Sequence, residues 1–160
     1  MENIKNDLFE FEVGTDGIGV LSINQINNPT NLFSTEFITA YIQLAQDAIT
    51  DKDIKGVIIT SSRSMFMPGA DLRELQNMGN YPKEQFETTM QMHQALRAIE
   101  TAGKPFVAAI NGTAMGGGLE LCLTCHHRIV LNNVKIKLGF PEAKVGLLPA
   151  GGGNSKAPYL

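Results

Sequence analysis

The 160-residue sequence has little cysteine, no excess of basic charge and no long hydrophobic run. Its two cysteines are too few for a disulfide framework. Thirteen Lys and Arg residues against 16 Asp and Glu residues give a net charge of −3, which does not favour nucleic acid or an anionic membrane surface. The longest purely apolar run, Phe106–Ile110, is far shorter than the roughly 20 residues of a membrane-spanning helix. The sequence therefore predicts no nucleic-acid partner and no transmembrane segment.

A secretory signal is also missing from the start of the sequence. Residues 1–7 have neither the basic region nor the apolar stretch of such a signal, so we expect a cytoplasmic location. With 43% hydrophobic and 18% charged residues, the composition is typical of a globular domain and not of a disordered chain.

Glycine is the residue in excess, at 16 of 160 positions. Ten of these lie between Gly103 and Gly153, and they include triplets at 116–118 and 151–153. Neither triplet is followed by the Lys-Ser/Thr pair of a phosphate-binding loop or fits a dinucleotide-binding motif. Backbone N–H groups at a helix start can instead hold another anion, such as an enolate oxygen.

Strand and helix patterns alternate along the chain. The turn-rich segment Gly14–Gly17 separates two β-prone runs and predicts a hairpin, and Ser34 is a candidate N-cap for an amphipathic helix. The hairpin strands are expected at Leu8–Val13 and Gly19–Ile23, strands buried on both faces at Gly56–Thr60 and Phe106–Ile110, and further strands at Arg128–Leu131 and Val134–Leu138. Helices are expected after Ser34, from Ala70, over Pro82–Ala102 and over Leu119–Cys125. This order predicts an α/β domain with right-handed crossovers.

A short cysteine motif has three possible functional interpretations, besides a purely structural one. Cys122, Cys125 and His126 have the C-x-x-C-H spacing of covalent haem attachment, but such chains are exported and this one has no export signal. A redox pair would need a strand-to-helix entry, and a structural zinc site would need two separated ligand pairs. We therefore expect the two cysteines to be core residues, and we predict no metal site. His93 is expected to be a packed or partly exposed helix residue.

Two carboxylates stand in apolar surroundings. Glu120 follows the first glycine triplet, and Glu142 lies in a loop between two apolar stretches. Burial raises the pKa of a carboxyl group, and two such groups facing one cavity can divide acid and base roles. The spacing alone leaves open that Glu120 stabilises a helix N-terminus and that Glu142 lies in an exposed turn.

Three segments together resemble the crotonase superfamily, in its enoyl-CoA hydratase/isomerase branch. They are Phe66–Asp71, Asn111–Glu120 and Pro141–Pro149, in that order. The resemblance implies an α/β fold with a ββα-spiral core. The following residues, up to Gly153, are similar to the hydratase portion of multifunctional fatty-acid β-oxidation proteins, in which a 3-hydroxyacyl-CoA dehydrogenase follows.

The resemblance also implies a site and a reaction. Ala70 and Gly117 match the two backbone donors of the oxyanion hole of the family, which holds the thioester carbonyl oxygen. Glu120 matches the base that activates water, and Glu142 matches the acid that protonates Cα, in syn hydration of a trans-2-enoyl-CoA. The family also includes isomerases, and having both glutamates favours the hydratase, a lyase.

Substrate-binding residues follow from the same resemblance. They are expected at Phe66, Met67, Gly69, Ala70, Asp71, Leu72, Arg73, Gly116 and Gly117, with Ala150 where many hydratases have glycine. The substrate is an acyl-CoA thioester and no separate cofactor is expected, because coenzyme A is part of the substrate. A homo-oligomer or a β-oxidation complex is the expected assembly of the full-length protein.

The pattern breaks near the end of the sequence. Residues 1–153 are expected to form the N-terminal core of the crotonase domain and residues 154–160 a divergent tail, truncated before a C-terminal helical region. Crotonase domains run on for about another hundred residues, in line with the upper range of domain sizes. The alternative function is a crotonase-like fragment that folds or self-associates without turnover.

Overall fold

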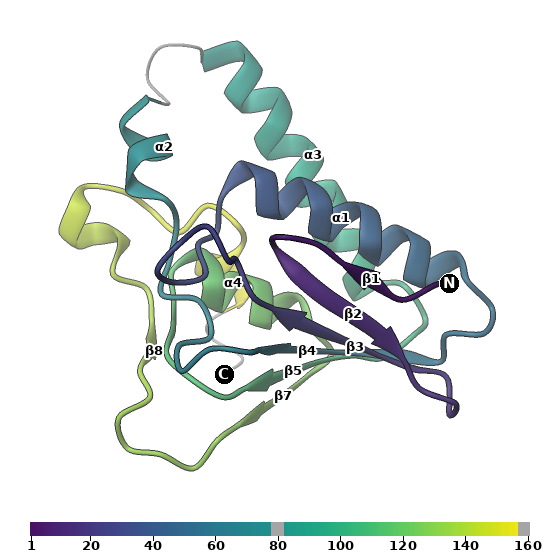
Figure 1. The fold of residues 1–160 in the computed structure, drawn as a ribbon. Helices are drawn as coiled ribbons and strands as arrows, with labels where there is room; N and C mark the ends of the chain where they lie inside the picture. The colour runs from purple at the N-terminus through teal and green to yellow at the C-terminus, as the bar shows by residue number, and fades with distance from the viewer. Residues whose placement is uncertain (78–81, 157–160) are drawn as a thin grey trace.

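A computed structural model of the chain describes residues 1–77 and 82–156. Its main sheet has six strands in the order β1-β2-β3-β4-β5-β7, and a second sheet pairs β6 with β8 (Figure 1). The strands are β1 (Ile4–Lys5), β2 (Phe9–Val13), β3 (Ile18–Ile23), β4 (Gly56–Ser61), β5 (Phe106–Ile110), β6 (Ala114–Met115), β7 (His127–Val130) and β8 (Leu138–Gly139). The helices are α1 (Thr35–Thr50), α2 (Leu72–Asn77), α3 (Pro82–Glu100), α4 (Gly117–Thr124) and α5 (Gly153–Lys156), with a 3₁₀ helix at Glu142–Val145.

The predicted hairpin is confirmed. β2 and β3 pair antiparallel, and Gly14 closes the turn by donating its N–H to the Ile18 carbonyl at 2.9 Å. β1, which pairs with β2, has only two residues and carries no pattern that could be read from the sequence.

Strands β3, β4, β5 and β7 are parallel neighbours, as the βαβ pattern predicts. In Figure 1, α1, α3 and α4 lie on one side of this sheet. Residues of β4 and β5 alternate between buried and half-buried positions. The expectation that these strands are buried on both faces is therefore wrong, because the helices cover only one face.

Helix α1 forms as its sequence predicts. The Ser34 hydroxyl accepts a hydrogen bond from the Phe37 N–H at 3.2 Å, which satisfies one of the free donors at the helix start. The buried residues of the helix recur at helical spacing and pack on the sheet: Phe37, Tyr41, Leu44, Ala45 and Ala48.

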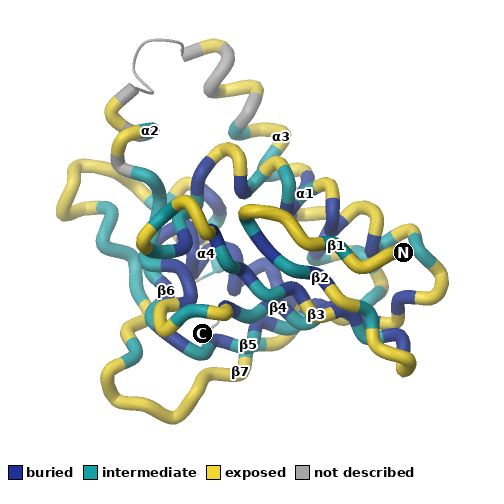
Figure 2. The backbone as a smooth tube through the Cα atoms, viewed as in Figure 1, coloured by how far each residue is buried: buried dark blue, intermediate teal, exposed yellow. Residues whose placement is uncertain are grey.

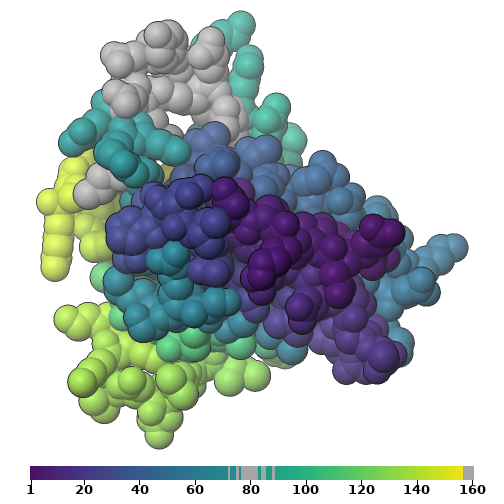
Figure 3. Space-filling view, viewed as in Figure 1, coloured from purple at the N-terminus to yellow at the C-terminus, as the bar shows by residue number. Residues whose placement is uncertain are grey.

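The strand expected at Val134–Leu138 is wrong. Only Leu138 and Gly139 pair, with β6, and the preceding residues form an exposed loop in which Val134 is 99% exposed. The alternating side chains suggest a strand, but β7 ends at Val130 and no strand of the described residues pairs with 131–137. The exposed loop is yellow in Figure 2 and projects at the lower left of Figure 3.

Loops that follow the parallel strands gather at one edge of the molecule. The carboxyl ends of β4, β5 and β7 point to the left in Figure 1, where α2, β8 and the 3₁₀ helix also lie. In open parallel sheets this edge is the usual place for a ligand site. No helix in the described part of the chain is long and apolar enough to cross a bilayer.

Candidate active site

A cavity of about 240 Å³ opens at this edge and contains the two predicted glutamates. Its wall also includes the two predicted backbone donors, Ala70 and Gly117. Most of the remaining wall is apolar, and the large apolar residues are Phe33, Ile38, Ile42, Met92, Leu147 and Leu148. The structure therefore brings together four residues that are separated by up to 72 positions in the sequence, from Ala70 to Glu142.

Glu120 lies in the first turn of α4 and is 4% exposed. Its Oε1 accepts hydrogen bonds from the backbone N–H groups of Gly151, at 2.7 Å, and Gly153, at 2.9 Å. Burial raises the pKa of Glu120, these two donors partly oppose the rise, and the nearby charge of Glu142 adds to it. A buried carboxyl group with a raised pKa is suited to proton transfer near neutrality.

Glu142 is the first residue of the 3₁₀ helix rather than part of the expected loop. It is half-buried and lines the same cavity as Glu120. Its Oε1 lies close to Gly116, where an added Cβ would stand only 2.9 Å from that oxygen. Its Oε2 is buried and has no hydrogen-bond partner among the described residues. This oxygen is therefore available to a ligand.

Two backbone N–H groups are available in the same cavity. Gly116 adopts a φ of +52°, which favours glycine, and turns the chain into α4 so that Gly117 is the first helical residue. The first N–H groups of a helix have no partner within the helix. Neither Gly117 nor Ala70 donates its N–H to any acceptor in the described residues. Together with the helix dipole, they form a candidate site for a developing negative charge.

A second cavity of about 580 Å³ lies against the first. The two share Ala70, Asp71, Gly117, Glu142 and Leu147. The wall of the second cavity adds Pro68, Gly69, Arg73, Gly116 and Lys144, so it carries two cationic side chains. The free N–H groups lie where the two cavities meet.

The expected substrate-binding residues fall into three groups. Gly69, Ala70, Asp71, Arg73, Gly116 and Gly117 line one or both cavities, and Ala150 lines the smaller one. Phe66 and Met67 are fully buried in the core and line neither cavity. The side chain of Leu72 lies outside the described residues.

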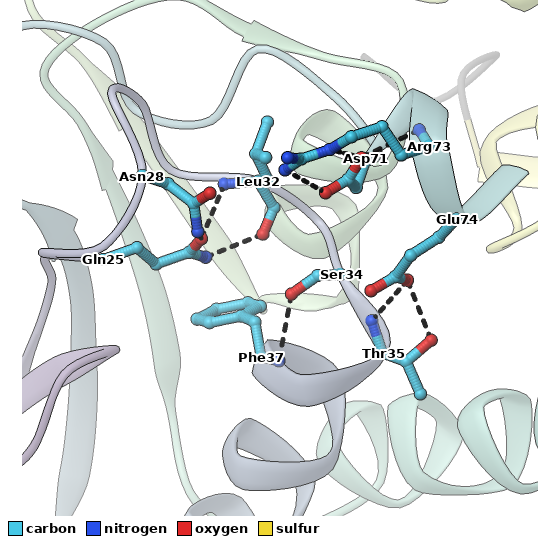
Figure 4. Close-up of polar contacts among 9 residues, drawn as sticks. All are labelled: Gln25, Asn28, Leu32, Ser34, Thr35, Phe37, Asp71, Arg73 and Glu74. Atoms are coloured by element: carbon cyan, nitrogen blue, oxygen red, sulfur yellow. Dashed lines mark hydrogen bonds and ion pairs between the residues drawn. The ribbon is translucent and has the colours of Figure 1, made fainter.

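Asp71 has a local partner within the second cavity. Its carboxylate accepts hydrogen bonds from the backbone N–H of Arg73 at 2.8 Å and from the Arg73 guanidinium at 2.9 and 3.1 Å (Figure 4). The guanidinium holds the pKa of Asp71 below its ordinary value. Asp71 is therefore ionised at neutral pH and orients the Arg73 side chain.

The apolar walls of the smaller cavity were not found from the sequence. Ile38 and Ile42 belong to α1, and Met92 belongs to α3. In the sequence, such residues have the spacing of ordinary apolar positions of an amphipathic helix. No local signal distinguishes a residue that faces a cavity from one that faces the core.

The two cysteines of the motif are part of the core, as expected. Cys122 and Cys125 are buried, and burial raises the pKa of Cys122 and raises that of Cys125 to about 12. Both are therefore neutral thiols, unsuited to nucleophilic or redox chemistry. His93 is half-buried and lines another cavity with Arg97 and His126.

Comparisons with known proteins agree with one another. Residues 15–158 match the enoyl-CoA hydratase/isomerase family. The fatty acid oxidation complex subunit alpha of Shewanella loihica is 37% identical over 146 residues, which are 91% of this chain and 20% of the relative. That of Idiomarina loihiensis is 36% identical over 154 residues, 95% of this chain and 22% of the relative. The chain thus spans about a fifth of the length of these relatives.

Solved structures share the fold. The enoyl-CoA hydratase of Thermoplasma volcanium superposes with a TM-score of 0.82 at 26% identity, over 97% of this chain and 60% of that one. The enoyl-CoA hydratase of Bacillus anthracis gives a TM-score of 0.80 at 27% identity, over 95% of this chain and 57% of that one.

Proposed function

Because the chain belongs to the enoyl-CoA hydratase/isomerase family, we propose that its cavity adds water across the double bond of a trans-2-enoyl-CoA to give a 3-hydroxyacyl-CoA. The observation that carries this proposal is the meeting of two carboxylates and two unpaired backbone N–H groups in one cavity of about 240 Å³. Hydration of a conjugated thioester needs these parts: a base, an acid and donors for the carbonyl oxygen.

The thioester carbonyl oxygen accepts hydrogen bonds from the N–H groups of Ala70 and Gly117 in this proposal. Negative charge grows on that oxygen as water adds at Cβ, so donors already aimed at it stabilise the transition state more than the ground state. Removing one such donor generally costs about 2.7–4 kcal/mol of transition-state stabilisation.

Glu120 acts as the base and Glu142 as the acid. The Glu120 carboxylate takes a proton from water while the water oxygen bonds to Cβ, and the Cα–Cβ π electrons move toward the thioester. The Glu142 carboxylic acid then gives its proton to Cα. A proton passes from Glu120 back to Glu142 to restore the starting state. Both carboxyl groups line one cavity, and in this proposal they deliver hydrogen and hydroxyl to the same face of the double bond.

The two cavities divide the substrate between them. The apolar wall of the smaller cavity suits the acyl chain. The larger cavity, with Arg73 and Lys144, suits the coenzyme A portion and its phosphates. No separate cofactor enters this scheme, because coenzyme A is part of the substrate.

The cellular role of the chain belongs to the same proposal. Identity of 36–37% to fatty acid oxidation complex alpha subunits supports a place in fatty-acid oxidation and in a larger assembly. Self-association and a cytoplasmic location remain predictions.

The test follows the absorbance of the conjugated thioester while crotonyl-CoA is incubated with the chain. We expect the absorbance to fall with the wild-type chain and with Glu36→Gln, a control at an exposed glutamate of α1. Glu120→Gln and Glu142→Gln should each lower the rate at least about 100-fold, as expected for loss of a positioned acid or base. Unchanged rates in both variants would show that the site is elsewhere.

A further inference from the structure

Two buried amide side chains, Gln25 and Asn31, lie in the loop between β3 and α1, outside both cavities. Gln25 is 1% exposed and Asn31 is fully buried. Burying an amide is costly unless its donors and acceptors are paired. The hydrogen-bond partners of these two side chains therefore indicate their structural role.

Gln25 holds the backbone of Leu32 from both sides. Its Nε2 donates to the Leu32 carbonyl at 2.7 Å, and its Oε1 accepts from the Leu32 N–H at 3.1 Å (Figure 4). The Asn28 side chain also donates to the same Oε1, at 3.4 Å. The peptide units on both sides of Leu32 are therefore fixed, and Phe33 follows directly.

Asn31 joins this loop to the loop that carries Ala70. Its Nδ2 donates to the Ser61 hydroxyl at 2.9 Å and to the Phe66 carbonyl at 3.0 Å, and its Oδ1 accepts from the Gln25 N–H at 3.1 Å. It thus connects residue 25, residue 61 and residue 66 through one buried side chain.

Arg63, in the loop after β4, forms a second set of hydrogen bonds to the β3–α1 loop. Its guanidinium donates to the carbonyl groups of Gln25, Asn28 and Pro29 at 2.8–2.9 Å. These charge-assisted bonds hold the outer part of the β3–α1 loop against the loop after β4. The two loops are therefore linked in both directions.

Phe33 lies between the two backbone donors of the proposed site. Its N–H donates to the Gly69 carbonyl at 2.9 Å, beside Ala70, and its backbone pairs with Ala70 in an isolated parallel bridge. Its ring packs on Gly117, where an added Cβ would stand only 2.6 Å from Cδ1. One residue therefore sets the spacing between the two N–H groups.

We propose that Gln25 and Asn31 are positioning residues, which act through Phe33 to hold the N–H groups of Ala70 and Gly117 at the spacing that one thioester oxygen requires. This inference rests on the proposed function, because it assigns a task to the same pair of donors. Displacement of a reacting group by about 1 Å can cost 100-fold in rate, so a fixed Phe33 matters for turnover more than for substrate binding.

The test uses cinnamoyl-CoA, a conjugated thioester whose absorption moves to longer wavelength when its carbonyl oxygen accepts hydrogen bonds. The variants Gln25→Leu and Asn31→Leu keep side-chain size and remove the amide contacts. The control is Ile54→Ala, a core change in the turn before β4, at the opposite end of that strand from the site. Circular dichroism establishes that each variant is folded.

We expect the wild-type chain and Ile54→Ala to give the full red shift. The two leucine variants should give less than half of it at saturation, with crotonyl-CoA kcat about 100-fold lower and KM changed by less than about threefold. If either leucine variant unfolds, Ser61→Ala, which removes one acceptor of Asn31, should still reduce the shift.

Two results would overturn the inference in different ways. A full red shift in the folded leucine variants would mean that the amides only stabilise the fold. Absence of a red shift in the wild-type chain would mean that no carbonyl is held by these donors, and the proposed function would fail together with the inference.

Discussion

The ionised form of Glu120 destabilises the folded protein. Its carboxylate is buried beside Glu142, and the N–H groups of Gly151 and Gly153 compensate only in part for lost solvation. The pKa of a buried acid then rises, and ionisation at neutral pH lowers the stability of the native state.

The variant Glu120→Gln tests this cost through pH. The native pKa of Glu120 lies above its ordinary value of 4.5, so the native state binds more protons than the unfolded state between the two pKa values, and stability falls as pH rises through this window. Thermal unfolding should show that Glu120→Gln is more stable than the wild type at pH 7. The gain should shrink as the pH falls through this window toward 4.5 and change no further below it. If Glu120→Gln were destabilised by the same amount at pH 7 and at pH 4.5, the raised pKa of Glu120 would be contradicted.

Gly118 is needed for the close approach of α4 to the loop after β4. A Cβ added there would stand 2.2 Å from the Met67 carbonyl oxygen. Alanine in a helix interior normally gains about 0.5–1 kcal/mol over glycine, but here we expect Gly118→Ala to lower the free energy of unfolding by about 1–3 kcal/mol.

Urea denaturation measures this loss. Gly139→Ala is the matched control, because the nearest atom to its added Cβ is the Met115 sulfur at 3.9 Å. Equal stability of the two variants would mean that α4 does not require the close approach.

At the scale of elements, the start of α1 is tied to α2. Glu74 accepts hydrogen bonds from both the N–H and the hydroxyl of Thr35, each at 2.9 Å (Figure 4). Ser34 caps the same helix end by accepting from the Phe37 N–H. The wall of the smaller cavity therefore depends on local polar contacts at the helix start.

Loss of the Ser34 cap should be measurable. We expect Ser34→Ala to reduce the free energy of unfolding by about 1 kcal/mol, the usual effect of removing a serine N-cap. Ser62→Ala, at an exposed serine with no side-chain hydrogen bond in the described residues, should change it by less than about 0.5 kcal/mol. Chemical denaturation of both variants decides the point, and equal effects would refute the role of the cap.

Elements with a clear hydrophobic periodicity could be predicted from the sequence. Whether a segment forms a strand could not, where that depends on a neighbouring strand to pair with. The spacing of Phe37, Tyr41 and Leu44 identified α1 because one face of the helix is buried. Val134–Leu138 shows a strand pattern, but strand pairing depends on whether a partner lies alongside, and that is a property of the whole fold. The two-residue strands β1, β6 and β8 are too short to have a period.

At the scale of the whole molecule, the site is made by loops that meet at one edge of the sheet. The glycine triplet and the two glutamates could be predicted as candidate functional residues from the sequence, since clustered glycines and carboxylates in apolar surroundings are both unusual. Their shared cavity could not, because Ala70 and Glu142 come together only through the packing of α4 against both loops. The role of Gln25 and Asn31 could not be predicted either, because the sequence does not distinguish a buried amide side chain from an exposed one in a loop.

The central claim is that Glu120 and Glu142 deliver hydroxyl and proton to one face of a trans-2-enoyl-CoA. Hydration of crotonyl-CoA by the chain in deuterium oxide, followed by proton NMR of the product, tests it most directly. The account predicts a single deuterium at Cα, on the same face as the new Cβ hydroxyl group. A product with deuterium on both faces of Cα, or no hydrated product at all, would contradict it.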